Sequence, residues 1–191
     1  YAFYNCSKLT SITIPKGVTS IGYYAFHNCS SLTTITIPEG VTSIGDSAFF
    51  KCTNLTLITI PEGVTSIGSS AFNGCSSLTS ITIPEGVTSI GSSAFAYCSS
   101  LEAFNGDGNS YYKIVDNGRA LLVNGGKTLL AYAVANTAIS YTIPEGVTSI
   151  GNNAFQSCSI LTSVSLPSTL TSIDRYAFAG CSSLTSIQIP K

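Results

Sequence analysis

Charged residues are scarce in this sequence of 191 residues. Asp, Glu, Lys and Arg make up 9% of it, and the formal net charge is −1. An average soluble domain carries about a quarter of its residues as charged ones. A nucleic-acid-binding face needs clustered cations to neutralise phosphates, so that class of protein is excluded. Trp and Met are absent and there is one His, while 30 Ser and 22 Thr supply the polar surface.

Long apolar runs are missing as well. Ser, Thr, Gly or Pro interrupts every apolar stretch before it reaches the ~18–20 residues that a membrane-spanning helix needs, so we predict no membrane insertion within this chain. No basic segment followed by an apolar one marks a signal peptide near the start. The chain begins at Tyr1 and both ends fall inside a repeat. We therefore expect an excerpt of a longer repeat array.

Cysteine and proline recur in one register. Cysteine stands at positions 6, 29, 52, 75, 98, 158 and 181, so all but one of the steps are 23 residues. The prolines keep a common phase with them: Pro15, Pro38, Pro61, Pro84, Pro144, Pro167 and Pro190. A fixed period of this length is typical of a solenoid, in which each repeat forms one turn, or rung.

Each position of the repeat has a physical interpretation, here for residues 75–97. Alternation of apolar and polar residues at 78–83 predicts a short strand with one buried face, and Pro84 must end it because proline cannot donate to a ladder. Pro-Glu-Gly suits a type I turn with proline second and glycine fourth. Residues 92–95 predict a short helical turn with Phe95 in the core, and Cys98 closes the rung as a small buried residue.

The whole chain, residues 1–191, is therefore predicted to be a single solenoid of about eight rungs. Short parallel strands stack in a sheet about 4.8 Å apart, and columns of Leu, Ile, Val, Phe and Cys form the core. The expected strands end near Ile14, Ile37, Ile60, Ile83, Asn105, Ile143, Leu166 and Ile189.

The register breaks near residues 107–138. Residues 111–134 predict a β-meander of three strands, because Asp116-Asn117-Gly118 and Asn124-Gly125-Gly126 suit hairpin turns with positive φ. We expect this insertion to replace part of one rung while the sheet stays continuous. It is either a local elaboration of the scaffold or a specificity loop, in which Tyr111 and Tyr112 are the candidate binding residues.

The motif L-x-x-I-x-I-P-x-G-V-x-x-I-G-x-x-A-F-x-x-C resembles the BspA-type leucine-rich repeats of bacterial and protist surface proteins, over nearly the whole chain. Seven Ala-Phe pairs keep its phase, at positions 2, 25, 48, 71, 94, 154 and 177. The resemblance implies a leucine-rich-repeat solenoid on a secreted or cell-surface protein. It also implies a role in adhesion, with a host, matrix or cell-surface protein as the partner.

The outward positions of the predicted strands form columns of Thr and Ser. They offer a docking surface with hydroxyl groups and methyl groups at regular spacing, although Thr also suits an exposed strand for purely structural reasons. A water-ordering, ice-binding lattice is a rarer alternative. The candidate binding residues on this face are Thr13, Thr34, Thr36, Thr59, Ser80, Thr82, Thr142 and Ser165.

Catalytic and metal-binding patterns are not evident, so we predict no enzymatic activity, no cofactor and no metal site. His27 occupies a variable and, we expect, exposed repeat position. The glutamates after proline lie in single file, which does not make the compact oxygen cage that hard cations need. The cysteines stack in one column that suits disulfide geometry poorly, so we expect free, buried thiols.

The sequence thus predicts a non-catalytic protein-interaction or adhesion module. A passive spacer or stalk that presents another domain is the alternative. The near-identical rungs favour the spacer, and the aromatic residues of the insertion favour binding.

Overall fold

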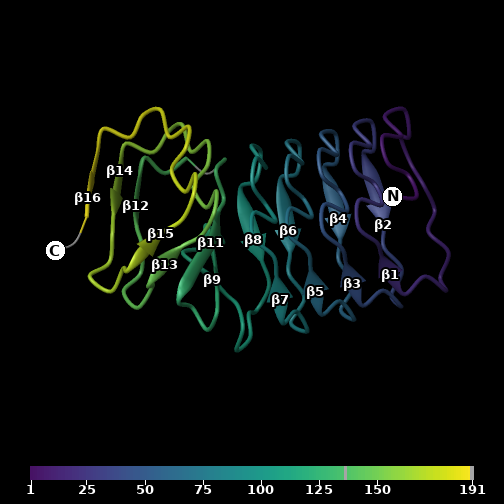
Figure 1. Cartoon of the computed structure of the whole chain (residues 1–191), viewed down its shortest axis with the longest axis horizontal. Helices are drawn as coiled ribbons and strands as arrows, with labels where there is room; N and C mark the ends of the chain where they lie inside the picture. Colours follow the sequence, from purple (N-terminus) through teal and green to yellow (C-terminus); the bar gives the residue numbers. More distant parts are fainter. Residues whose placement is uncertain (136, 190–191) are drawn as a thin grey trace.

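The computed structural model describes residues 1–135 and 137–189. The chain winds into a β-solenoid whose rungs follow one another along the long axis of the molecule (Figure 1). Each regular rung contributes a three-residue strand and a two-residue strand, and every pairing between equivalent strands is parallel. This confirms the leucine-rich-repeat solenoid with stacked parallel strands.

The three-residue strands form what we call the front row. Equivalent residues pair 23 positions apart, as Ile35 does with Ile58, and Thr13 joins the row through an isolated bridge to Thr36. These strands lie where the sequence predicts them. The front row consists of Thr34–Thr36 (β2), Leu57–Thr59 (β4), Ser80–Thr82 (β6), Ala103–Asn105 (β8), Ser140–Thr142 (β12), Ser163–Ser165 (β14) and Ser186–Gln188 (β16).

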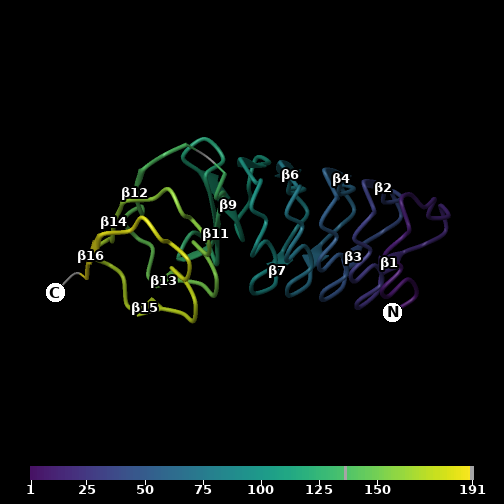
Figure 2. The same cartoon turned by 90° about the horizontal axis from the view of Figure 1, so that it is seen from above.

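The two-residue strands form a back row that the sequence analysis did not predict. Its repeating signal is Val-Thr-Ser-Ile, in which the serine is polar and the isoleucine is buried. In both Figure 1 and Figure 2 this row runs beside the front row along the whole molecule. The regular part of the back row consists of Ser20–Ile21 (β1), Ser43–Ile44 (β3), Ser66–Ile67 (β5), Ser89–Ile90 (β7), Ser149–Ile150 (β13) and Ser172–Ile173 (β15).

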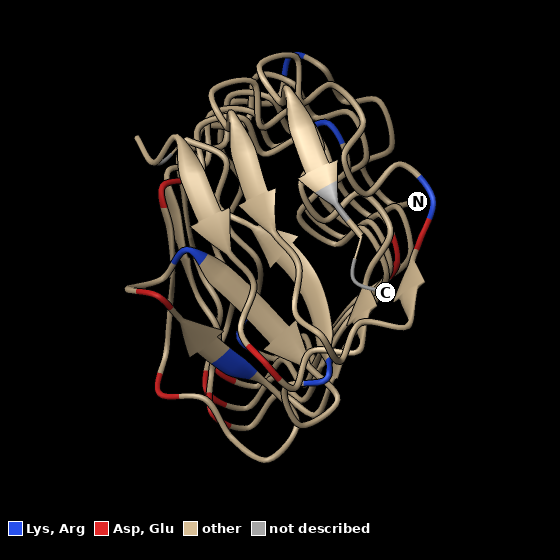
Figure 3. Cartoon of the chain, turned by 90° about the vertical axis from the view of Figure 1, so that its left-hand side faces the viewer, with Lys and Arg blue, Asp and Glu red and all other residues tan. Residues whose placement is uncertain are grey.

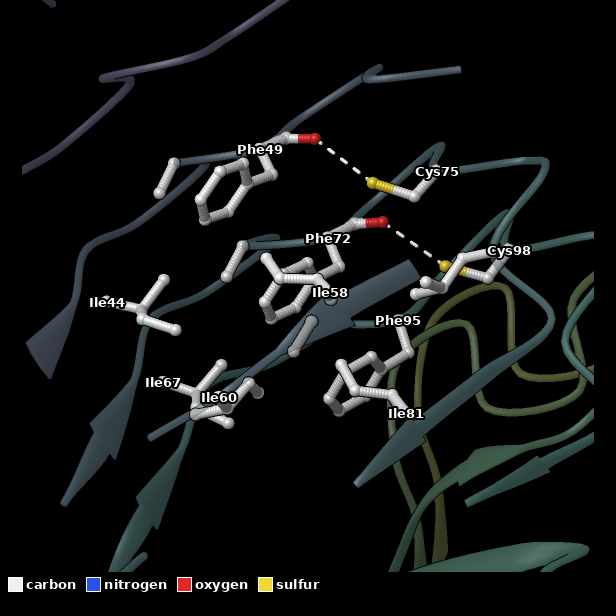
Figure 4. Close-up of a cluster of buried hydrophobic side chains, with 14 of the residues drawn as sticks. Ile44, Phe49, Ile58, Ile60, Ile67, Phe72, Cys75, Ile81, Phe95 and Cys98 are labelled. Atoms are coloured by element: carbon white, nitrogen blue, oxygen red, sulfur yellow. Dashed lines mark hydrogen bonds between the residues drawn. The ribbon is translucent and has the colours of Figure 1, made fainter. Parts of the chain in front are cut away.

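The core lies between the two rows and repeats from rung to rung (Figure 4). Phe26, Phe49, Phe72 and Phe95 stack on one another with ring centroids 5.3–5.7 Å apart and planes within 6° of parallel. Equivalent isoleucines from each row pack against these rings. Burying one such side chain contributes about 1.5–3 kcal/mol, so stacking supplies the stability that one rung alone lacks.

The cysteines are free, as predicted, and five of the seven are buried. Each of several thiols donates to the carbonyl oxygen of a phenylalanine in the preceding rung: Cys75 Sγ lies 3.2 Å from Phe49 O, and Cys98 Sγ lies 3.2 Å from Phe72 O (Figure 4). Burial raises the pKa of Cys52 and of Cys98 to about 12. The thiols therefore serve as small core residues that also satisfy a buried carbonyl.

The third segment of each rung, which we call the turn edge, runs from the Gly after the back strand to the Cys. The sequence predicts a short helical turn here, and this prediction is wrong for the described residues. Residues 92–97 form consecutive hydrogen-bonded turns, with Ala96 N donating to Ser93 O at 3.1 Å. Ser93 has φ +57°, and a left-handed residue at this point stops a right-handed helix from continuing.

The turn after proline also differs from its prediction. Val87 N donates to Pro84 O at 3.1 Å, and the other rungs repeat this bond, so proline is the first turn residue and glycine the third. In this rung the Ile83 carbonyl oxygen, which the predicted turn would use, accepts from the Tyr112 hydroxyl instead. Glycine fits the third position because a Cβ at Gly86 would lie 3.1 Å from Glu62 O in the preceding rung.

The insertion forms the predicted three-stranded meander. Lys113–Val115 (β9), Ala120–Val123 (β10) and Thr128–Tyr132 (β11) pair antiparallel, with β10 in the middle. β11 then takes a place in the back row, because it pairs in parallel with β13 through Thr128↔Ser149 and Leu129↔Ile150. Tyr132 replaces the core phenylalanine of a rung, with its ring stacked 4.9 Å from that of Phe155.

The predicted continuity of the sheet holds on one side of the insertion only. β11 continues the back row toward the C-terminus. On the other side, in the part of the chain that the structure describes, no ladder joins β7 to β9. Side chains of the insertion bridge this gap, as described below.

The meander is also buried on both faces, which the sequence analysis missed. All four residues of β10 are buried. Leu121 and Val123 pack into the hydrophobic cluster of the N-terminal rungs, whereas Ala120 and Leu122 pack into that of the C-terminal rungs. The continuous apolar run Ala-Leu-Leu-Val is the signal for this, since a strand buried on both faces does not alternate. The insertion is thus an internal partition between two blocks of rungs.

Candidate functional site

The outward positions of the front row lie on the surface, as predicted. Within each strand the middle residue is buried and its neighbours point to solvent, for example Thr34 and Thr36 on either side of Ile35. Ser80 is half-buried. The exposed members of the predicted set are Thr13, Thr34, Thr36, Thr59, Thr82, Thr142 and Ser165.

The hydroxyls of the front row differ from those of the threonines that precede the strands and of the serines that follow the cysteines. Before most of the back strands, the threonine hydroxyl donates to the carbonyl oxygen of the equivalent threonine one rung earlier: Thr65 Oγ1 lies 3.3 Å from Thr42 O, and Thr88 Oγ1 lies 3.3 Å from Thr65 O. Similar ladders run through Thr33 and Thr56 and through Ser76 and Ser99. These hydroxyls hold adjacent rungs together.

On the front row, by contrast, the side-chain hydroxyls of Thr36, Thr59 and Thr82 make no hydrogen bond to another described residue. Each remains available as a donor and as an acceptor. Equivalent hydroxyls repeat at the strand spacing of about 4.8 Å. The front row is therefore a regular array of unoccupied hydrogen-bonding groups.

The front row is uncharged through most of its length. In the end-on view of Figure 3, the Lys, Arg, Asp and Glu residues lie mainly at turns and edges, and β12 and β14 contain none. Leu57 stands among the hydroxyls with 58% of its surface exposed. Such a surface suits a partner that offers backbone amides or other neutral polar groups, together with a small apolar contact.

Tyr111 and Tyr112, the candidate residues of the insertion, are used within the fold. Tyr112 has no exposed surface, and its hydroxyl donates to Ile83 O at 2.7 Å. Burial raises the pKa of this phenol. The Tyr111 hydroxyl accepts a bond from Ile90 N at 3.1 Å. Tyr112 therefore does not present a contact surface to a partner, and Tyr111 is half-buried beside β7, the last back strand of the N-terminal rungs.

Asn109 is a structural residue that the sequence analysis missed. Its side-chain amide donates to Glu85 O at 2.5 Å and to Val87 O at 2.7 Å, while its Oδ1 accepts from Tyr111 N at 2.7 Å. Together with the two tyrosines it covers the end of the N-terminal block, where the regular ladder stops. The Gly-Asn-Ser sequence at residues 108–110 could have signalled an Asx-type turn.

His27 is not the exposed residue that we expected. It is half-buried and its ring stacks between those of Tyr4 and Phe50, at centroid distances of 4.7 Å on both sides. Burial lowers the pKa of the imidazole, and Nδ1 has no hydrogen-bond partner among the described residues. The imidazole therefore acts as part of an aromatic stack.

The part of the chain that the structure describes contains neither a metal-binding cluster nor a membrane-spanning helix. No group of three or more His, Cys, Asp or Glu side chains within residues 1–135 and 137–189 is arranged to hold a metal ion. Over the same residues, no helix has the length and apolar character needed to cross a membrane. That the chain is not an enzyme stays a prediction.

Comparison with known families decides the classification. The model of the BspA type leucine-rich repeat region matches residues 1–117 and 127–191, in six copies. The chain belongs to the BspA-type leucine-rich repeat family. The match resumes at residue 127, one residue before β11 begins at Thr128. This boundary agrees with the structure, in which β11 pairs with β13 as a member of the back row. No curated protein is significantly similar to the chain.

Several solved structures share the fold. A leucine-rich cell surface protein from Faecalibacterium prausnitzii is 36% identical over 99% of this chain, with a TM-score of 0.83. The pneumococcal vaccine antigen PcpA is 26% identical over 95% of the chain, with a TM-score of 0.82. A leucine-rich repeat protein from Bacteroides ovatus is 30% identical over 100% of the chain and 69% of its own length, with a TM-score of 0.58.

The chain covers only part of the first two of these proteins. It spans 57% of the Faecalibacterium protein and 51% of PcpA. The BspA-type solenoid described here is therefore comparable to one portion of those chains.

Proposed function

We propose that this BspA-type solenoid is a non-catalytic protein-interaction module of a secreted or cell-surface protein, and that the front row is its docking surface. The observation that carries the proposal is the difference between the two sets of hydroxyls. The hydroxyls of the threonines just before the strands, such as Thr56, Thr65 and Thr88, donate to the neighbouring rung. The hydroxyls of Thr36, Thr59 and Thr82 on the exposed front row make no hydrogen bond to another described residue. The comparison with a cell surface protein and a bacterial antigen supports the location.

The partner that this surface suits is another protein, such as a host, matrix or cell-surface protein. A hydroxyl array with little charge gives weak electrostatic steering, so affinity depends on hydrogen bonds and on close contact over many rungs. An interface of ~800 Å² on each side is typical of specific complexes. Adhesion of a cell to its surroundings follows if the whole protein is anchored at the surface.

Binding of the chain to a panel of matrix, plasma and epithelial proteins tests the proposal. The informative variant is the triple substitution Thr36→Lys/Thr59→Lys/Thr82→Lys, which places three like charges on the front row. Its matched control is Ser43→Lys/Ser66→Lys/Ser89→Lys on the back row, where equivalent serines recur on successive strands. We expect specific binding that the front-row variant loses and the back-row variant keeps.

A passive spacer is the second candidate, because the regular rungs repeat almost the same outward residues. Binding surfaces usually vary from repeat to repeat, whereas a spacer needs only a stable rod. Specific binding that survives the front-row substitution contradicts the docking surface proposed here. Failure of the chain to bind any member of the panel favours the spacer.

A further inference from the structure

A notch opens on the turn edge, away from the front-row strands. It has a volume of about 660 Å³, and four successive levels of the turn edge line it. The rung of Phe50 and Lys51 forms one wall and that of Tyr97 another, with the rung of Asn73 as the floor between them and Ser157 on the next level beyond Tyr97. The residues that matter for its chemistry are Phe50, Lys51, Asn73, Gly74, Tyr97 and Ser157.

The backbone at this notch has an unusual choice of residues. The residue before each cysteine has a positive φ in every complete rung, and a left-handed conformation favours Gly and Asn. Lys51, with φ +56°, and Tyr97, with φ +58°, are the two long side chains in this column, and they flank Gly74. The remaining members are small or are asparagines, namely Asn5, Asn28, Gly74, Ser157 and Gly180.

Long side chains at such positions cost conformational free energy that the equivalent Asn and Gly residues avoid. Both exceptions line the same notch, one rung on either side of a glycine. Backbone ladders place these rungs side by side, since Lys51 N donates to Asn73 O and Gly74 N donates to Ala96 O, each at 2.8 Å. The two long side chains of this column therefore stand on either side of one glycine, with the rung of Gly74 between them.

The Lys51 side chain lies beside the Phe50 ring and forms no ion pair with a described residue. Its ammonium group lies 5.5 Å from the centroid of the Phe50 ring, and a Cβ built on Gly74 would lie 3.2 Å from Lys51 Cγ. The lysine stem therefore packs closely over Gly74, which has no side chain to displace it. No Asp or Glu lines the notch, and no ion pair of Lys51 occurs within the described residues.

The opposite side of the notch offers an aromatic ring and neutral polar groups. Tyr97 is 49% exposed, and its ring and hydroxyl have no partner in the described part of the chain. The Asn73 side-chain amide lies between the two walls and is likewise unpaired among the described residues. Two rung spacings, about 10 Å, separate the backbones of Lys51 and Tyr97, which leaves room for one six-membered sugar ring.

We propose that this notch binds a sugar residue that carries a carboxylate, as in sialylated or uronic-acid-containing glycans. The apolar face of the sugar ring packs on Tyr97, as sugar C–H groups commonly do on aromatic rings. The carboxylate accepts hydrogen bonds from the Lys51 ammonium and the Asn73 amide. A single lysine that a neighbouring ring holds in place favours an anionic ligand, and the flat aromatic wall favours a sugar over a flexible acidic side chain.

Titration of the whole chain with sialyllactose, with a galacturonic acid trimer and with neutral lactose tests this proposal. The variants are Lys51→Asn and Tyr97→Asn, because Asn already occupies this column at positions 5 and 28 and tolerates the same φ. Lys16→Asn, which removes an exposed lysine after Pro15, is the control for net charge. Binding is followed by calorimetry, and the melting temperature of every variant is recorded.

We expect at least one acidic sugar to bind and lactose to bind far more weakly. Lys51→Asn should weaken binding at least about tenfold, the loss expected for one charge-assisted hydrogen bond. Both notch variants should melt at or above the temperature of the wild-type chain, and Lys16→Asn should bind normally. The acidic sugar that binds more tightly identifies the source of the ligand.

Three outcomes overturn the proposal: no binding of either acidic sugar, equal binding of lactose, or acidic-sugar binding that Lys51→Asn leaves intact. Failure of the panel experiment on the front row would not affect this result, because the notch and the front row share none of the substituted residues.

Discussion

The regular rungs and the insertion bury their side chains in different ways. In a regular rung the front strand buries its middle residue and exposes the residues on either side, as with Ile58 between Leu57 and Thr59. In the insertion, β10 is buried on both faces and contacts the clusters on either side of it. The regular rungs therefore keep a free outer surface, while the middle of the insertion has none.

This difference assigns roles to the two regions. An insertion in a repetitive scaffold often determines which partner is bound. Here, however, the side chains of Tyr112 and Asn109 form hydrogen bonds with the last rung of the N-terminal block. On the far side, the Tyr141 hydroxyl donates to Asp116 Oδ2 at 2.6 Å, which ties the insertion to the C-terminal block. The insertion thus couples two blocks of rungs, and the exposed rows of the regular rungs remain for recognition.

The largest expected effect comes from truncating the partition itself. Leu121→Ala and Leu122→Ala remove side chains that point to opposite blocks, and each should lower the free energy of unfolding by ~2–5 kcal/mol. Denaturant unfolding measures both. Leu57→Ala, at a 58% exposed front-row residue, is the control and should cost less than ~0.5 kcal/mol. Equal effects at Leu122 and Leu57 would mean that the insertion is a surface loop.

A smaller effect tests how closely the regular rungs approach one another. A Cβ at Gly45 would lie 2.8 Å from the backbone of Gly22 and Tyr23, whereas a Cβ at Gly22 has nothing within 4 Å. Gly45→Ala should therefore destabilise the chain by ~1–3 kcal/mol through overpacking, and Gly22→Ala should be nearly neutral. Thermal unfolding of the two variants makes the comparison, and similar melting temperatures would contradict it.

The contact between the insertion and the regular rungs gives the next effect. Tyr112→Phe removes the buried hydroxyl that bonds Ile83 O and should cost ~1–3 kcal/mol, because it leaves a buried carbonyl without this donor. Tyr111→Phe removes a half-buried hydroxyl beside Ile90 and should cost less. Chemical denaturation distinguishes them. A Tyr112→Phe variant as stable as the wild type would show that the hydroxyl does not hold the two regions together.

The smallest effect concerns the two kinds of threonine within the regular rungs. Thr65→Val removes a hydroxyl that bonds Thr42 O and should cost ~0.5–1.5 kcal/mol. Thr59→Val, on the front row, should leave stability within ~0.5 kcal/mol of the wild type. Denaturant midpoints compare the two. If Thr59→Val is the more destabilising change, the front row has a structural role and the docking proposal loses its main support.

Much of the fold could be predicted because a 23-residue period places every Cys, Pro and Ala-Phe pair in one phase. The front strands, the free thiols and the three strands of the insertion follow from that register and from local turn residues. The short helical turn could not be excluded from sequence, since the positive φ of Ser93 arises at a serine, a residue that gives no warning of it.

The candidate site was only partly predictable. Exposure of Thr36 and Thr59 follows from strand alternation, but which hydroxyls bond the neighbouring rung depends on the stacking of whole rungs. The burial of Tyr112 depends on a carbonyl 29 residues earlier in the chain. Lys51 and Tyr97 stand out only when the backbone conformation of the entire column is known.

Hydrogen exchange of the whole chain, followed by mass spectrometry of its peptides, tests most directly whether the insertion belongs to the core. The account predicts that peptides covering β10 and β11 exchange as slowly as those covering β4, β6 and β13, because all of them open only when the solenoid unfolds. Fast exchange of β10 and β11 alongside slow exchange of the regular rungs would contradict it. The insertion would then be a mobile surface element and again a candidate for the recognition site.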